Sequence, residues 1–130
     1  MKLIRIKDFK EEPGMEKEKV YAMSVAKIVP LLVAKAVKKG RTEEEVYTVI
    51  QWLTGYDPDG IMECIKSEMS YKLFFEQAPL LNPNRKLITG KVCGICVEEI
   101  EDSLTQEIRY LDKLIDELAK GRSMDKILRC

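Results

Sequence analysis

Two cysteines three positions apart are the first residues in this sequence whose spacing could support chemistry. Cys93 and Cys96 stand in the stretch KVCGIC, a spacing typical of structural zinc sites and thiol redox centres. A structural zinc site takes four ligands, yet Cys64 and Cys130 each stand alone in a chain without histidine. A redox centre needs a helix that starts at the motif, and VEEIED after Cys96 does not clearly open one. We therefore expect no metal at this pair, and we interpret Cys93 as a small buried apolar side chain.

The absence of histidine removes several further classes of chemistry. It excludes Ser-His-Asp and Cys-His catalysis, His-ligated zinc and haem held by a proximal histidine. An enzyme built on this chain would have to use carboxylates, lysine, tyrosine or thiolate. The acidic run Glu98, Glu99, Glu101 and Asp102 could bind a divalent cation. It lacks the ladder of an EF-hand loop, however, and acidic residues before a helix commonly stabilise the N-terminus of that helix.

A third group of candidates is aromatic and could line a pocket for a small molecule. It consists of Trp52, Tyr56, Phe74 and Phe75, with Arg109 and Tyr110 as polar contacts. Asn82, in the turn LLNPN, is a further candidate for a ligand or partner surface. Aromatic side chains at helical spacing are more often part of a hydrophobic core, so packing is the alternative interpretation.

Length and composition predict one globular domain. A chain of 130 residues is long enough to bury roughly two-thirds of its unfolded surface, and 45% of the residues are hydrophobic and 34% charged. The formal net charge is zero, but basic residues outnumber acidic ones by eleven to five in residues 1–41, whereas acidic residues prevail by eight to two in 42–83. These segments could face each other within one fold or support head-to-tail association.

No stretch indicates secretion, membrane insertion or nucleic-acid binding. The opening segment MKLIRIKDFKEEPGMEKEK is too charged for a signal peptide, and the longest apolar run, IVPLLVA, is far too short to span a bilayer. A helix-turn-helix around KKGRT would place three glutamates where such motifs contact phosphates. We therefore expect a cytoplasmic protein with reduced thiols and without a membrane or nucleic-acid partner.

The elements that must position these candidates are predicted to be helices. Apolar residues recur with helical spacing over residues 24–40, and Pro30 must lie in the first turn of this helix or kink it. The stretch TEEE makes a capping box of Thr42 and Glu45. This box opens a second helix, which Gly55 ends.

Shorter helices are predicted next, followed by an ambiguous segment. Residues 57–67 open with Asp-Pro and residues 70–78 with serine, which are helix-start signals. Asn84 could cap the segment after the LLNPN turn. Residues 84–97 combine helical spacing with Gly90 and β-branched residues, and we interpret them as a helix rather than a strand.

The last long helix, opened by Asp102, has the most regular apolar stripe of the chain. This stripe, called the seam below, is spaced four, three, four, three and consists of Leu104, Ile108, Leu111, Ile115 and Leu118. Such spacing suits packing against another helix, either within the chain or across a dimer axis. Arg109, Asp112 and Lys113 are expected to form an ion network of small energetic value on the surface of this helix.

Six stretches together form a recognisable pattern: KKGRTEEEV, WLTGYD, FFEQAPLLNPN, LITGKVCG, VEEIED and IRYLDKLIDELAKGR. They resemble a bacterial family known as domain of unknown function 2200, over about residues 21–129. The family has no assigned activity, so the resemblance implies a small bacterial domain and no mechanism. Members of the family begin near the position of Lys19 and typically carry arginine in place of Cys96. The resemblance thus implies that residues 1–18 are an extension and that the Cys-x-x-Cys pair is peculiar to this chain.

We therefore predict an all-α fold, a compact single-domain bundle of five or six helices over residues 19–130. Residues 1–18 form an N-terminal extension with a short extended segment. The leading hypothesis for function is protein association without catalysis or cofactor, including a homo-oligomer formed through the seam of the last helix. The alternative is a histidine-free enzyme or small-ligand binder that uses the aromatic cleft. DNA binding and a cysteine-based metal or redox function are less favoured.

Overall fold

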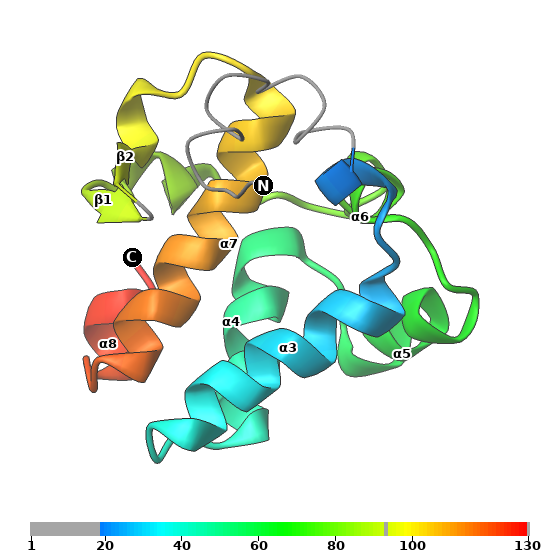
Figure 1. Cartoon of the computed structure of the whole chain (residues 1–130), viewed down its shortest axis with the longest axis horizontal. Helices are drawn as coiled ribbons and strands as arrows, with labels where there is room; N and C mark the ends of the chain where they lie inside the picture. Colours follow the sequence, from blue (N-terminus) through cyan, green and yellow to red (C-terminus); the bar gives the residue numbers. More distant parts are fainter. Residues whose placement is uncertain (1–18, 93, 130) are drawn as a thin grey trace, which may run out of the picture.

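The chain folds into a set of α-helices joined by short turns (Figure 1). A computed structural model describes residues 19–92 and 94–129. Its elements are α3 (Val25–Lys38), α4 (Glu43–Thr54), α5 (Pro58–Lys66), α6 (Tyr71–Glu76), the 3-10 turn η1 (Pro83–Leu87), β1 (Lys91–Val92), β2 (Ile95–Cys96), the 3-10 turn η2 (Val97–Glu99), α7 (Ser103–Ala119) and α8 (Met124–Ile127). The prediction of an all-α fold is confirmed. The proposed extension, residues 1–18, lies outside the described residues.

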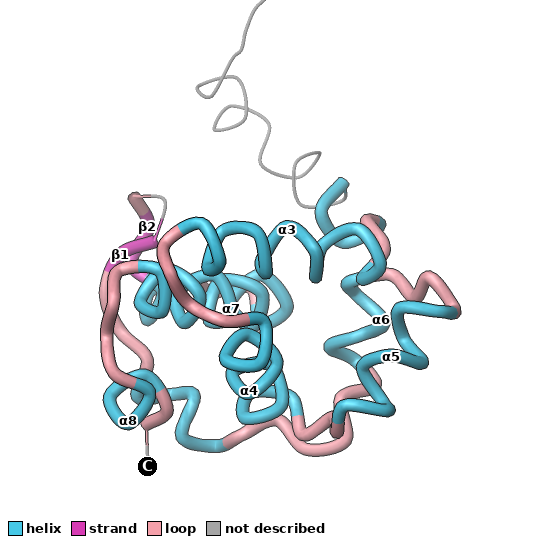
Figure 2. Tube along the Cα trace, turned by 90° about the horizontal axis from the view of Figure 1, so that it is seen from below, coloured by secondary structure: helices cyan, strands magenta, loops and turns pink. Residues whose placement is uncertain are grey.

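Helix α7 is the central element of this arrangement. It packs against α3, α4, α6 and α8 and against the hairpin of β1 and β2. Figure 2 shows α5 and α6 at one end of the molecule, and the hairpin and α8 at the other. Four residues of the seam are buried within the chain, namely Ile108, Leu111, Ile115 and Leu118. The strict heptad-like stripe therefore serves intramolecular packing.

A homo-oligomer formed through this seam stays a prediction, and the burial of four seam residues within the chain does not support it. These four side chains already pack in the core of the same chain, so they offer little surface to a second copy, whereas Leu104 is only partly buried. A second face of α7 is buried as well, through Tyr110 and Leu114. We expected Tyr110 to be a polar contact beside the seam, but its ring is 2% exposed.

The corner between α3 and α4 forms as the sequence indicates. Gly40 adopts a left-handed φ of +90°, which glycine tolerates without steric cost. The capping box is present, because the Glu45 amide donates to Thr42 Oγ1 at 3.1 Å and the Thr42 amide donates to Glu45 Oε1 at 2.9 Å. Pro30, in contrast, lies inside α3 beyond its first turn, where it has no amide hydrogen to donate to the helix.

Residues 84–97 do not form the helix that we expected. The cap of this segment is Asn82 and not Asn84, since the Asn84 amide donates to Asn82 Oδ1 at 2.8 Å. A short turn, η1, follows, and then β1 and β2 pair as an antiparallel hairpin. Gly90 and Gly94 have φ values of +104° and +80°, which are incompatible with a continuous right-handed helix. Conformational freedom at these glycines outweighed the helical spacing of the apolar residues.

Gly55 ends α4 at a point where another segment passes very close. Its φ is +81°, and a Cβ built on it would lie 2.7 Å from the backbone nitrogen and 2.8 Å from the backbone oxygen of Leu80. The Leu80 amide donates to the Thr54 carbonyl at 3.1 Å. The loop after α6 is thereby fixed against the end of α4.

Gly55→Ala is therefore expected to destabilise the protein more than Gly40→Ala. Both changes place alanine in the left-handed region at a cost of roughly 1 kcal/mol, but no described atom lies within 4 Å of a Cβ at Gly40. The backbone overlap with Leu80 should add about 1 kcal/mol to the loss at Gly55. Urea denaturation of the two variants measures this difference, and equal losses would contradict the close approach.

Candidate functional site

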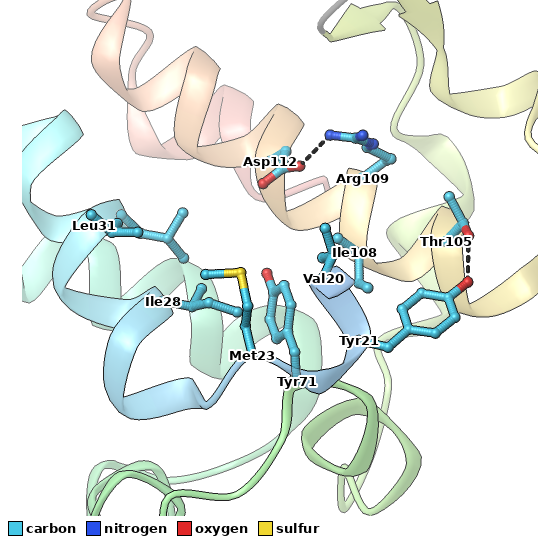
Figure 3. A pocket seen from close by; sticks show the side chains of 11 residues that line it. Val20, Tyr21, Met23, Ile28, Leu31, Tyr71, Thr105, Ile108, Arg109 and Asp112 are labelled. Carbon is cyan, nitrogen blue, oxygen red and sulfur yellow. Dashed lines mark hydrogen bonds and ion pairs between the residues drawn. The ribbon is translucent and has the colours of Figure 1, made fainter. Parts of the chain in front are cut away.

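A cavity of about 270 Å³ lies where α3, α6 and α7 meet (Figure 3). Apolar side chains make up a large part of its wall, and five polar side chains complete it. The lining residues are Val20, Tyr21, Met23, Ile28, Leu31, Leu32, Tyr71, Thr105, Ile108, Arg109 and Asp112. Mostly apolar concave sites with a few convergent polar groups are typical of small-molecule sites.

Helix α7 supplies one wall of the cavity through a face distinct from most of the seam. Thr105, Ile108, Arg109 and Asp112 follow the spacing i, i+3, i+4 and i+7, which places them on one side of a helix. Only Ile108 belongs to both faces. The helix can therefore fill the core with one face while it presents polar groups to the cavity with the other.

Tyr71 is held in the wall by a short backbone bridge. The Tyr71 amide donates to the Met23 carbonyl at 2.8 Å, and the Val25 amide donates to the Met69 carbonyl at 2.8 Å. The side chain of Ser70 caps α6 by accepting a bond from the Leu73 amide at 3.1 Å. These bonds join the segment before α3 to the start of α6. They fix the backbone from which the tyrosine ring enters the cavity.

The hydroxyl of Tyr71 is buried and has no hydrogen-bond partner in the part of the chain that the structure describes. The residue is 3% exposed. Figure 3 shows the ring directed toward the side of the cavity where Asp112 and Arg109 lie. Burial raises the pKa of Tyr71 well above its usual value, and the charge of Asp112 adds to this effect. The phenol is therefore neutral at physiological pH and retains its proton for donation.

Arg109 and Asp112 form an ion pair at the edge of the cavity. Arg109 donates from Nη1 to Asp112 Oδ2 at 3.0 Å, and each side chain is 26% exposed. Burial raises the pKa of Asp112, while Arg109 acts in the opposite direction. This pair was expected on the open surface together with Lys113. Lys113 instead donates to the Lys91 carbonyl at 3.1 Å and takes no part in the pair.

Tyr21 closes another side of the cavity. Its hydroxyl donates to Asp102 Oδ2 at 2.7 Å and lies 2.7 Å from Thr105 Oγ1. Burial raises the pKa of Tyr21. Asp102 also caps α7, because it accepts from the Thr105 amide at 2.9 Å. The helical residues 19–22 are in this way attached to the start of α7.

The aromatic cleft expected from the sequence does not form. Tyr56 and Phe74 stack with ring centroids 4.7 Å apart, and the Tyr56 hydroxyl donates to the Phe74 carbonyl at 2.8 Å. Phe75 is also buried, and the half-buried Trp52 packs against the same core. Packing, the alternative interpretation of these aromatic residues, is therefore correct.

The remaining candidates are dispersed over the fold. Asn82 caps η1, and Tyr110 is buried on α7, where its pKa is raised by burial and by the charge of Glu107. Of the five residues that we expected to form a ligand or partner surface, Arg109 is the one among the described residues that lines the cavity. Tyr71, Tyr21 and Asp112 were not recognised as site residues.

The cysteines and the acidic run are not drawn together into a metal site within the described residues. Cys96 is half-buried in β2, and Cys64 is buried in α5, where burial raises the pKa of its thiol. Cys93 and Cys130 lie outside the described residues. Over residues 19–92 and 94–129, no group of three or more His, Cys, Asp or Glu could hold a metal ion. Glu98 accepts a bond from the Gly90 amide at 3.0 Å, which is a structural role.

Comparisons with known proteins show one family and one solved structure similar to this chain. The family model described as "Uncharacterized protein conserved in bacteria (DUF2200)" matches residues 19–129. The crystal structure of the uncharacterized protein SP1917 is 46% identical, with a TM-score of 0.81, and the match covers 85% of this chain and 91% of that chain. A comparison with curated proteins gives no match. Among the described residues, no helix is long and apolar enough to cross a membrane.

Proposed function

The chain belongs to the DUF2200 family of bacterial proteins, and from this premise we propose that it binds a small molecule in the cavity beside Tyr71. The family carries no activity that could be transferred, so the function has to be argued from the site. One observation carries the proposal. A buried hydroxyl without a hydrogen-bond partner among the described residues lies in the wall of a cavity.

The buried hydroxyl of Tyr71 destabilises the folded state, and no hydrogen bond from the described residues compensates for this. A buried polar group without a partner destabilises a protein by about 1–3 kcal/mol, and phenylalanine would fill the same space without that cost. Groups of this kind are retained where function requires them. A ligand that accepts or donates a hydrogen bond at Tyr71 Oη would satisfy the group.

Binding without catalysis fits the polar groups of the cavity. Tyr71 is neutral near physiological pH, and burial raises its pKa further, so its hydroxyl is available there as a hydrogen-bond donor rather than as a base. Asp112 is already paired with Arg109. The competing hypothesis of protein association loses its main support, because the seam of α7 is buried within the chain. We also propose a cytoplasmic location, which the free thiols of Cys64 and Cys96 fit.

Tyr71→Phe is expected to leave the free energy of unfolding unchanged or raise it by up to about 2 kcal/mol, because the variant removes an unsatisfied buried hydroxyl. Tyr56→Phe is the matched control. It removes a hydroxyl that donates to the Phe74 carbonyl at 2.8 Å, and it should lower the free energy of unfolding by about 1 kcal/mol. Urea denaturation of both variants measures the change in the free energy of unfolding and shows whether each change is an increase or a decrease.

The same variants test binding. In a thermal-shift screen of small molecules, a ligand of this cavity should raise the melting temperature of the wild type and of Tyr56→Phe, since ligands stabilise the state that they bind. The shift should be lost in Tyr71→Phe. The proposal fails if Tyr71→Phe destabilises the fold as much as Tyr56→Phe does, because the hydroxyl would then have a structural partner. It also fails if no compound gives a shift that depends on Tyr71.

A further inference from the structure

We propose that the ligand of the Tyr71 cavity is a small neutral molecule with an apolar body and an amide-like edge, that is, a hydrogen-bond donor beside an acceptor. This inference rests on the proposed function and names the chemical class that the site would select. It follows from the size of the cavity, the charges in its wall and the hydrogen-bonding capacity that remains there.

The size of the cavity limits the ligand to a metabolite or fragment. Its volume is about 270 Å³, slightly below the range of roughly 300–1,000 Å³ that is usual for drug-sized ligands. At about 30 Å³ for each water molecule in the liquid, it corresponds to roughly nine waters. A compound with on the order of ten non-hydrogen atoms fits this space. Apolar residues, including Met23, Ile28 and Leu32, form much of the wall, so most of the ligand surface is apolar.

The charges of the wall disfavour an ionised ligand. The described lining residues include one cation, Arg109, and one anion, Asp112, which are paired at 3.0 Å. Elsewhere on these two helices, Lys35 of α3 and Asp116 of α7 lie 3.7 Å apart and also balance each other. A carboxylate or an ammonium group would therefore have to leave water without gaining an unpaired counter-charge. Such desolvation without compensation is unfavourable.

The remaining hydrogen-bonding capacity suits a donor–acceptor edge. The Tyr71 hydroxyl can donate, and Arg109 binds one of the two carboxylate oxygens of Asp112, Oδ2, so that Oδ1 can accept from a ligand. Both residues line the same cavity, and Figure 3 shows the Tyr71 ring directed toward the side where Asp112 lies. A carbonyl oxygen of the ligand would accept from Tyr71, and an adjacent N–H group would donate to Asp112. The hydroxyls of Tyr21 and Thr105 already donate to Asp102 Oδ2 at the N-terminus of α7. They are therefore less available to a ligand than the Tyr71 hydroxyl.

Three matched probes test this inference on the full chain: benzamide, benzoate and benzylamine. They share one ring and differ in the charge of the substituent, which near neutral pH is zero, negative and positive in turn. We expect benzamide to bind, and we expect the dissociation constants of benzoate and benzylamine to be higher by about tenfold or more. Titrations followed by protein NMR measure the three constants and show whether the signals of residues around the cavity shift.

Variants of the Arg109–Asp112 ion pair test whether the charges of the wall determine which ligand binds. Asp112→Asn leaves Arg109 without its partner and should strengthen benzoate binding by about tenfold or more relative to the wild type. Arg109→Gln should do the same for benzylamine. Tyr71→Phe should abolish the binding of benzamide, whereas the Tyr56→Phe control should retain it. Circular dichroism and melting temperatures establish that each variant is folded before it is titrated.

The outcomes separate this inference from the proposed function. If benzoate or benzylamine binds the wild type more tightly than benzamide and the binding depends on Tyr71, the cavity is a ligand site but the neutral class is wrong. If none of the three probes binds, the inference is also wrong. The proposed function then survives only if the wider screen gives a compound that requires Tyr71. Equal binding of all three probes would show that the wall does not discriminate by charge.

Discussion

Leu111→Ala is expected to lower the free energy of unfolding by about 2–5 kcal/mol. Leu111 is 1% exposed and lies in the middle of α7, the helix that packs against α3, α4 and α6. Alanine removes buried apolar surface and leaves a cavity that neighbouring helices cannot fully close. Because small domains are stable by only about 5–15 kcal/mol in total, this loss is a large share of the stability of the protein. Urea denaturation provides the measurement.

An exposed leucine provides the control for this substitution. Leu73 in α6 is 42% exposed, so Leu73→Ala should change the free energy of unfolding by less than about 1 kcal/mol. Leu111→Asp, which places a charge in the same core position, should prevent folding altogether. A folded Leu111→Asp variant with an unchanged melting temperature would show that the seam is not buried, and the central position of α7 would then be wrong.

Local signals in the sequence predicted the helix boundaries well. The capping box of Thr42 and Glu45 and the stop at Gly55 depend on residues within one turn of each other, so their physics is contained in the sequence. The corner after α7 follows the same local rule as the corner after α3. Gly121 has a φ of +89°, and Gly40 has a φ of +90°. These two corners have similar sequences, KKGRT at residues 38–42 and AKGRS at residues 119–123, which reflects what a tight helix end requires.

The failures occurred where distant segments decide the outcome. Periodicity alone did not show that Val92 of β1 would be buried against α7 in a hairpin, because strand pairing at residues 91–96 competes with a helix only once the partner surface exists. The stripe of α7 was identified correctly, but periodicity cannot say whether a stripe meets its own chain or a second copy. The buried Tyr110 beside it depends on the same tertiary context.

The candidate site was missed for a related reason. The wall of the cavity is assembled from residues near Met23, at the start of α6 and on α7, which are far apart in the sequence. The bridge between Ser24 and Ser70 that positions Tyr71 has no local signature. The spacing of Arg109 and Asp112 on one helix face was visible in the sequence, but half-burial at a cavity was not. The sequence does not distinguish Tyr71 from Tyr56 by residue type, although only one of their hydroxyls has a partner among the described residues.

A second substitution with a large expected effect concerns the only acidic side chain of α7 that is paired with two arginines in the described residues. Glu117 is 5% exposed; Arg129 contacts its two carboxylate oxygens at 2.6 and 2.8 Å, and Arg122 donates to it at 3.2 Å. Both arginines follow α7 in the sequence. This carboxylate thus attaches the C-terminal segment, including α8, to the central helix.

Glu117→Gln should lower the free energy of unfolding by about 2–4 kcal/mol, because the change keeps the volume but leaves Arg129, which is 14% exposed, without its counter-charge. The neighbouring residue provides the matched control. Asp116 also pairs with two cations, Lys35 at 3.7 Å and Lys120 at 3.1 Å, but these lysines are 49% and 73% exposed. Asp116→Asn should therefore lower the free energy of unfolding by less than about 1 kcal/mol.

The ion pairs of Glu117 and Asp116 should also differ in their sensitivity to salt. At an ionic strength of about 1 M the screening length falls to about 3 Å, so the small effect of Asp116→Asn should disappear while most of the effect of Glu117→Gln persists. Urea denaturation at low and high salt gives all four values. If Glu117→Gln proved as mild as Asp116→Asn, Arg129 would be reaching solvent in the native state, and the C-terminal segment would be held mainly by its apolar contacts, including those of Ile127, rather than by this ion pair. Loss of the Glu117 effect at high salt would have the same meaning, because a screened pair is an exposed pair.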